Sequence, residues 1–267
     1  MKHLLPAPRL LMLALVLYST NVLAARCTET HPCLFGVFPH TGTAQLRDTY
    51  SVVAEDLSLT LDTPVHLASG PVGGGFRKML DQGEWDIALV GPGNFILHAQ
   101  PAGYLPIAST GRQIIYQLTT LAERQIRTPK QLRGHRLGTM LPDSSTWLVT
   151  MDLLEQYHLA PARDVEIVHF SSQRGCLHAL VIGRVEACVL ARPIFRILQQ
   201  QYQARFLILA ETPEYAGPLY VVHPNLSESL RQRIADYLQS RPGTGPVNLS
   251  ALDPYREIVR RLGRLSP

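Results

Sequence analysis

The chain has 267 residues, of which 46% are hydrophobic and 17% charged. This length and composition fit one or two globular domains and exclude a disordered or coiled-coil protein. The net charge of +4 falls by two, to +2, without Met1–Ala24, which carries Lys2 and Arg9 and no acidic residue. No run of Lys or Arg forms a basic stripe, so we expect no nucleic-acid partner.

The N-terminal segment has the organisation of a secretory signal peptide. Lys2 and Arg9 give it a basic start, Leu10–Leu17 is purely apolar, and small residues lead up to Ala24. The apolar run is much shorter than the roughly 20 residues that span a bilayer. We therefore predict cleavage after Ala24 and export to the periplasm, with a membrane anchor at residues 1–24 as the alternative.

Apolar runs alternate with stretches of helical period along most of the chain. This pattern predicts an α/β protein with doubly wound, mostly parallel sheets, because strands covered on both faces are nearly continuous apolar runs. Strands are expected at Leu34–Phe38, Val65–Ala68, Trp85–Val90, Leu105–Ser109, Gln117–Ala122, Arg136–Thr139, Val165–Phe170, Ala187–Leu190, Phe206–Ala210 and Leu219–Val222. Helices are expected at Thr43–Leu59, Phe76–Asp81, Ser145–Tyr157, Gln173–Ile182, Leu226–Gln239 and Asp253–Leu262.

The predicted strands are too many for one small sheet, and the charged stretch Glu123–Gly134 separates two runs of alternating strands and helices. We therefore predict two lobes, between which the chain crosses near Thr119–Arg124 and returns near Pro213–Leu219. The expected ranges are 25–119 for the first part of lobe 1, 120–214 for lobe 2, and 215–267 for the return segment and C-terminal helices of lobe 1.

Four cysteines suit an exported protein, because thiols pair in an oxidising compartment. Two of them lie near the expected mature N-terminus, and the other two lie within one helix–strand unit. We therefore predict the local disulfides Cys27–Cys33 and Cys176–Cys188. Capture of a metal or metalloid by the thiolates is the alternative, but no C-x-x-C spacing supports it. We expect neither a metal nor a cofactor.

Polar residues gather where strands end and helices begin, at Phe38–Thr43, Gly91–Phe95 and Pro142–Trp147. In an open α/β sheet, ligands bind beyond the carboxyl ends of the strands, where helix N-termini offer free N–H groups to an anion. Ser144–Thr146 supplies three hydroxyls in a row, whereas a helix N-cap needs only one. These junctions indicate a site for a small anion. The sequence has no G-x-S-x-G elbow, no Walker-type phosphate loop and no H-E-x-x-H helix.

Several short motifs, in one order, carry a resemblance to a known family. A G-E-x-D-x-A-x-x-G-P pattern is matched at Gly83–Pro92, and Ser144–Trp147 corresponds to a phosphonate-clasping S-T-S-G turn. Further matches lie at Phe35–His40, Gln131–Arg136, Gly183–Ala187 and Asp253–Arg256. Together they resemble the periplasmic phosphate/phosphite/phosphonate-binding family of ABC-transporter receptors, over roughly residues 34–256.

The resemblance implies the type 2 periplasmic-binding-protein fold, with two doubly wound lobes joined by a two-strand hinge. It further implies a solute-binding receptor, expected to be a monomer, that closes on a small oxyanion and delivers it to an ABC-transporter permease. A periplasmic ligand sensor that partners a sensor histidine kinase is the alternative. An enzyme using Ser144 and a distant histidine is a third hypothesis, but no sequence feature places a base beside Ser144, and we expect no catalysis.

The resemblance also implies a set of site residues, with departures from the family. His40 and Phe95 stand where the family has aromatic hydroxyls, and Trp147 replaces the glycine of the S-T-S-G turn. Ala191 replaces an acid that can hold the amino group of aminoalkyl substrates, which argues against that amine. Arg192 then becomes either an anion clamp or a solvated surface residue. The expected ligand-binding residues are His40, Thr41, Asn94, Phe95, Ser144, Ser145, Thr146, Trp147 and Arg192.

Overall fold

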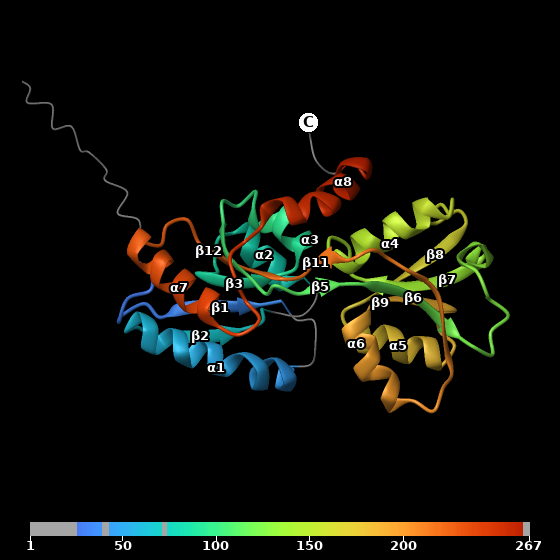
Figure 1. Cartoon of the computed structure of the whole chain (residues 1–267), viewed down its shortest axis with the longest axis horizontal. Helices are drawn as coiled ribbons and strands as arrows, with labels where there is room; N and C mark the ends of the chain where they lie inside the picture. Colours follow the sequence, from blue (N-terminus) through green and yellow to red (C-terminus); the bar gives the residue numbers. More distant parts are fainter. Residues whose placement is uncertain (1–25, 39–42, 71–73, 264–267) are drawn as a thin grey trace, which may run out of the picture.

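A computed structural model describes residues 26–38, 43–70 and 74–263, which form two five-stranded sheets lying side by side (Figure 1). We call each sheet with its helices a lobe. Lobe 1 contains β1 (Cys33–Val37), β2 (Val65–Ala68), β3 (Ile87–Val90), β4 (Leu105–Ser109) and β12 (Leu219–Val222). Lobe 2 contains β6 (Tyr116–Leu121), β7 (His135–Met140), β8 (Val165–Phe170), β9 (Ala187–Ala191) and β10 (Phe206–Glu211). The predicted signal peptide lies outside the described residues.

The sheets are mixed, so the expectation of mostly parallel sheets needs correction. In lobe 1 the order is β2-β1-β3-β12-β4, with β1 parallel to β2 and β3 but β12 antiparallel to both of its neighbours. In lobe 2 the order is β10-β6-β9-β7-β8, with β7 parallel to β8 and β9 but β6 antiparallel to β9 and β10. Strands joined by a crossover helix run parallel, whereas β6 and β12 each enter their sheet from the other lobe.

A short antiparallel ribbon, β5 (Gln113–Ile114) with β11 (Tyr215–Ala216), lies at the junction of the two lobes (Figure 1). The return strand β11 falls within the segment Pro213–Leu219 that the sequence indicated. The first crossing lies earlier than the expected Thr119–Arg124, because β6 already belongs to the sheet of lobe 2. The sequence does not show this crossing because β5 has only two residues and therefore no apolar run.

Helices cover both faces of each sheet. In lobe 1, α1 (Thr43–Leu61) and α7 (Glu228–Ser240) share a core with Ile87 and Leu89 of β3. The alternate residues Ala88 and Val90 face α2 (Gly75–Asp81) and the π-helical turn η1 (Phe95–Ala99), which continues α3 (Pro92–Asn94). This alternation along β3 is that of a strand buried on both sides.

In lobe 2, α5 (Gln173–Val181) and α6 (Arg192–Leu198) cover one face and α4 (Ser145–Gln156) the other. The last helix, α8 (Asp253–Arg261), packs on α4 above the junction of the lobes (Figure 1), and Arg261 pairs with Glu155 at 2.9 Å. Short 3-10 turns lie at Pro129–Leu132, Gln199–Gln201 and Leu249–Leu252. Among the described residues, none of the helices has the length and apolar character needed to cross a membrane.

Both predicted disulfides are present. Cys27–Cys33 joins the N-terminal segment to β1, and Cys176–Cys188 joins α5 to β9. The second disulfide lies against β7 at Gly138, where a Cβ atom would be 2.5 Å from Sγ of Cys176. Because glycine has no Cβ atom, the disulfide can pack directly against β7 at this position.

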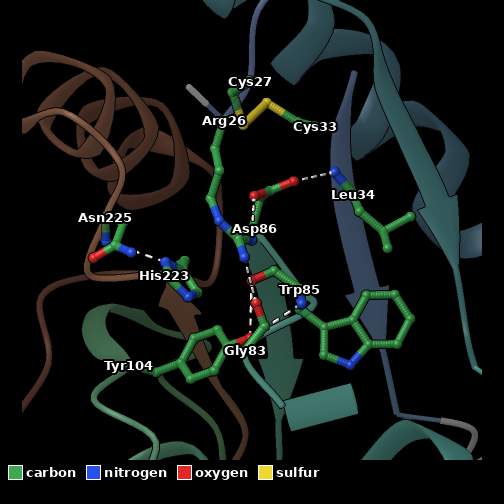
Figure 2. Close-up of polar contacts among 10 residues, drawn as sticks. All are labelled: Arg26, Cys27, Cys33, Leu34, Gly83, Trp85, Asp86, Tyr104, His223 and Asn225. Atoms are coloured by element: carbon green, nitrogen blue, oxygen red, sulfur yellow. Dashed lines mark hydrogen bonds and ion pairs between the residues drawn. A yellow bond between two sulfur atoms is a disulfide. The ribbon is translucent and has the colours of Figure 1, made fainter. Parts of the chain in front are cut away.

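An ion pair beside the first disulfide connects the N-terminal segment to β3 (Figure 2). The guanidinium group of Arg26 donates to the carboxylate of Asp86 at 2.9 Å and to the carbonyl of Gly83 at 2.7 Å. The second oxygen of Asp86, a nearly buried residue, accepts from the backbone N–H of Leu34 at 2.8 Å. Asp86 therefore ties β1 to the start of β3, and the carboxyl ends of these two strands reach the junction of the lobes.

Candidate functional site

A cavity of about 150 Å³ lies where the two lobes meet. Phe38, Gly91 and Asn94 line it from lobe 1, just beyond the ends of β1 and β3, while Met140 and Phe170 end β7 and β8 on the side of lobe 2. This is the edge of an α/β sheet at which ligands bind. The described part of the chain thus has a cavity at the place that the strand–helix junctions indicated.

The starts of α3 and α4 touch across this junction. The N–H of Gly93 donates to Oγ of Ser145 at 3.0 Å, and the guanidinium of Arg77 donates to the carbonyl of Pro142. A Cβ atom on Gly93 would lie 2.7 Å from the carbonyl oxygen of Asp143 and 2.8 Å from the backbone nitrogen of Ser145. Only a glycine permits this close approach, so the described conformation is one in which the lobes are in contact.

The three hydroxyls at the start of α4 have different partners. Oγ of Ser144 accepts from the N–H of Trp147 at 3.2 Å and donates to the carbonyl of Leu141 at 2.8 Å, so Ser144 is the helix cap. Oγ of Ser145 accepts from the N–H of Gly93 in lobe 1, and the Ser145 hydroxyl also interacts with the hydroxyl of Tyr116. The hydroxyl of Thr146 lines the cavity with no side-chain hydrogen bond to any described residue.

Asn94 is the most informative polar residue of the cavity. Its side chain lines the cavity although the residue is only 1% exposed, and Oδ1 has no hydrogen-bond partner among the described residues. An unpaired buried amide costs about 1–3 kcal/mol, and a carboxamide offers both a donor and an acceptor. Because Oδ1 is an acceptor, the missing partner must be a donor, such as the hydroxyl of a singly protonated oxyanion.

Two tyrosines extend the hydroxyl network behind Ser145. Tyr116, at the start of β6, lines the cavity, and its hydroxyl lies 3.2 Å from that of Tyr255 in α8. The Tyr255 hydroxyl in turn donates to the carbonyl of Ala216 at 3.2 Å. Burial raises the pKa of Tyr116 to about 12, although hydrogen bonds with Tyr255 and Ser145 act in the opposite direction. The phenol therefore stays neutral and protonated at physiological pH.

The described lining contains no Asp, Glu, Lys, Arg or His. The positive potential comes instead from the N-terminus of α4, where the first N–H groups have no backbone acceptor within the helix and the helix dipole favours an anion. Such a site can hold negative charge with hydroxyl, amide and backbone donors, without burying a cation.

Four of the residues expected from the sequence line the cavity, namely Asn94, Ser144, Ser145 and Thr146. Two others, His40 and Thr41, lie outside the described residues. The remaining three, Phe95, Trp147 and Arg192, are not part of the lining.

Helical geometry explains why these three turn away. Successive residues of a helix point about 100° apart, so when Asn94 faces the cavity its neighbour Phe95 faces the core, where it is buried. Trp147 is likewise buried in the core. Ala191 and Ile194 reach the cavity from the start of α6, and the half-buried Arg192 between them is not part of the lining.

Sequence reasoning missed the apolar part of the lining. Phe38, Met140, Phe170 and Ile194 belong to apolar runs and look like core residues in the sequence. The first three can be recognised by their position at the carboxyl end of a strand, where ligands bind whether the side chain is polar or apolar. Ile194 has no such signal, because a single isoleucine in a helix is usually core.

A family model for the ABC-transporter phosphonate periplasmic substrate-binding protein matches residues 35–259. The chain belongs to this family. The expected resemblance is therefore confirmed, and the family is one of periplasmic binding proteins for transport rather than of enzymes. In the comparison with curated proteins, no sequence matches this chain.

Solved structures confirm the type 2 periplasmic-binding-protein fold. PhnD1 from Prochlorococcus marinus, in complex with methylphosphonate, has a TM-score of 0.78 at 13% identity, covering 87% of this chain and 98% of that one. A binding-protein component of an ABC phosphonate transporter from Pseudomonas aeruginosa has a TM-score of 0.74 at 16% identity, covering 85% of each chain. The aliphatic sulphonate-binding protein SsuA from Escherichia coli has a TM-score of 0.58 at 16% identity, covering 87% of this chain and 86% of its own. Identities this low establish the shared fold alone.

Proposed function

We propose that this protein closes its two lobes on a small oxyanion, of the phosphate, phosphite or phosphonate type, and delivers it to an ABC-transporter permease. The observation that carries the proposal is the buried side chain of Asn94, which lines the cavity beside the start of α4 and whose acceptor Oδ1 has no partner among the described residues. The hydroxyl of a singly protonated oxyanion can donate to Oδ1, while its charged oxygens accept from the amide N–H groups. The family to which the chain belongs supports the transport role.

In this proposal the oxyanion accepts hydrogen bonds from Asn94, Ser145, Thr146 and the free N–H groups at the start of α4. Each charge-assisted hydrogen bond contributes about 1.5–3 kcal/mol, so four of them supply about 6–12 kcal/mol before the cost of closure. Micromolar binding corresponds to about 8 kcal/mol. His40 and Thr41 stay candidates on the strength of the sequence, whereas Phe95, Trp147 and Arg192 support the site from outside the cavity.

Closure follows from the position of the site between the lobes. A ligand that touches both lobes stabilises the closed form by its differential affinity, and the short β5–β11 ribbon provides the hinge. We propose that the first lobe boundary lies within this ribbon instead of at residues 119–120. The mature protein, beginning after Ala24, acts as a monomer.

A thermal-shift titration of the mature, ligand-stripped protein with phosphate, phosphite and methylphosphonate tests the proposal. A bound anion should raise the melting temperature with the logarithm of its concentration. Asn94→Ala should abolish most of that shift, whereas the control Asn225→Ala, at an exposed position far from the cavity lining, should retain it. If none of the anions shifts the melting temperature, or if Asn94→Ala responds like the wild type, the proposed site is wrong.

A further inference from the structure

A large part of the cavity wall is apolar. Met140 and Phe170, the last residues of β7 and β8, are direct neighbours in the sheet register, and Ile194 reaches the cavity from α6. All three belong to the apolar cluster of lobe 2. Polar residues come from the starts of α3 and α4, which touch each other at Gly93 and Ser145, and from lobe 2 at Tyr116, Ser171 and Gln173. Oε1 of Gln173 is already occupied, because it accepts from the N–H of Ala191 at 2.8 Å. The cavity therefore combines neutral polar groups, most of them near the starts of α3, α4 and α5, with an apolar wall formed by Met140, Phe170 and Ile194 of lobe 2.

No acidic side chain lines the cavity. All 21 Asp and Glu residues of the chain lie within the described ranges, and none of them is part of the lining. At the start of α6 the wall is formed by Ala191 and Ile194, which offer no hydrogen-bonding side chain. A ligand ammonium group would therefore be buried without a counter-charge, which is strongly unfavourable.

The volume of the cavity sets the size of the ligand. An apolar cavity of about 150 Å³ holds a molecule of the size of benzene, and this cavity has the same volume. It accommodates about six to eight non-hydrogen atoms by that comparison, which is an anionic head group with about three carbon atoms. A bare tetrahedral oxyanion would leave the apolar wall in contact with trapped water.

Resting on the proposed function, we propose that the site selects an alkylphosphonate with a short unsubstituted alkyl group over an aminoalkylphosphonate and over inorganic phosphate. The helix starts bind the phosphonate head, and the wall formed by Met140, Phe170 and Ile194 covers the alkyl chain. Each buried methylene then tightens binding about three- to fourfold.

Isothermal titration calorimetry on the ligand-stripped mature protein tests this selection with a matched pair of ligands. Propylphosphonate and 2-aminoethylphosphonate have the same number of non-hydrogen atoms and differ by a methyl in place of an ammonium group. Propylphosphonate should bind at least about tenfold more tightly than the amine, the size expected for one unsatisfied buried polar group. Affinity should increase stepwise from methyl- to ethyl- to propylphosphonate, and all three should bind more tightly than inorganic phosphate.

The outcomes separate this inference from the proposed function. Equal or tighter binding of the amine, or of phosphate, overturns the inference while leaving an oxyanion receptor in place. If no phosphonate and no phosphate binds, the proposed function fails, and this inference fails with it.

Ile194→Asp gives a second test, because it adds a carboxylate to the apolar wall. It should reverse the preference, so that 2-aminoethylphosphonate binds more tightly than propylphosphonate. The control Ile197→Asp makes the same change on the same helix at a side chain that is 60% exposed and outside the lining, and it should keep the wild-type preference. Ile194→Ala is the alternative variant if Ile194→Asp does not fold. It should reduce the increase in affinity that each added methylene gives. An unchanged gain would show that the alkyl chain does not contact this wall.

Discussion

Gly93→Ala tests whether the contact between the lobes belongs to the ligand-bound state. The added Cβ would lie 2.7 Å from the carbonyl oxygen of Asp143 and 2.8 Å from the nitrogen of Ser145, which is too close for either backbone atom. The lobes would have to separate, and the 3.0 Å hydrogen bond from Gly93 to Ser145 would be lost. Overpacking costs about 1–3 kcal/mol and the hydrogen bond contributes about 1 kcal/mol.

The closed form is therefore destabilised by about 2–4 kcal/mol, while an open, ligand-free form has no such clash. Ligand affinity, measured by calorimetry with the tightest phosphonate, should fall about thirtyfold to a thousandfold. The ligand-free melting temperature should change little. Gly245→Ala is the control, because a Cβ there meets no atom within 4 Å. Wild-type affinity in Gly93→Ala would refute the reasoning, and an equal loss of ligand-free stability would assign the contact to folding instead of closure.

Three further predictions concern stability. Gly36→Ala places a methyl group 2.5 Å from the indole of Trp85 and should lower the free energy of unfolding by about 1–3 kcal/mol, so an unchanged urea midpoint would contradict it. Replacing both Cys176 and Cys188 by Ser removes a disulfide between residues 12 positions apart and should lower the free energy of unfolding by about 3 kcal/mol. Reduction of the wild type should lower it by the same amount. An unaltered urea midpoint would rule this prediction out. The hydrogen bond from the adjacent arginine lowers the pKa of Asp164 to about 2 from its ordinary 3.8. Because the folded-state pKa is the lower one, this carboxylate stabilises the fold fully above about pH 4 and loses that contribution as the pH falls toward 2. Asp164→Asn should remove this part of the acid transition in melting curves between pH 2 and 6, and a superimposable pH profile would disprove the assignment.

Local patterns determined the secondary structure, the disulfides and the polar half of the site. Apolar periodicity placed the ten longer strands and six of the helices, because each such element must bury a face that recurs along its own sequence. It missed α6 and the short elements α3, η1, β5 and β11. Asn94 and the hydroxyls at Ser144–Thr146 were predictable because they lie at strand–helix junctions. The first N–H groups of a helix lack acceptors within the helix, and this property depends only on the local sequence. The short sequence spacing between cysteines indicated both disulfides for the same local reason.

Only the tertiary structure decided the features that depend on residues far apart in the chain. The antiparallel course of β6 and β12 follows from the crossing between lobes, which leaves no periodic signal. The contact of Gly93 with Ser145 joins residues 52 positions apart. Phe170 and Ile194 belong to apolar runs in the sequence, and they line a cavity only because two lobes meet beside them. Burial against a distant partner is a property of the assembled fold, and no local pattern of residues encodes which apolar side chain is left facing a ligand.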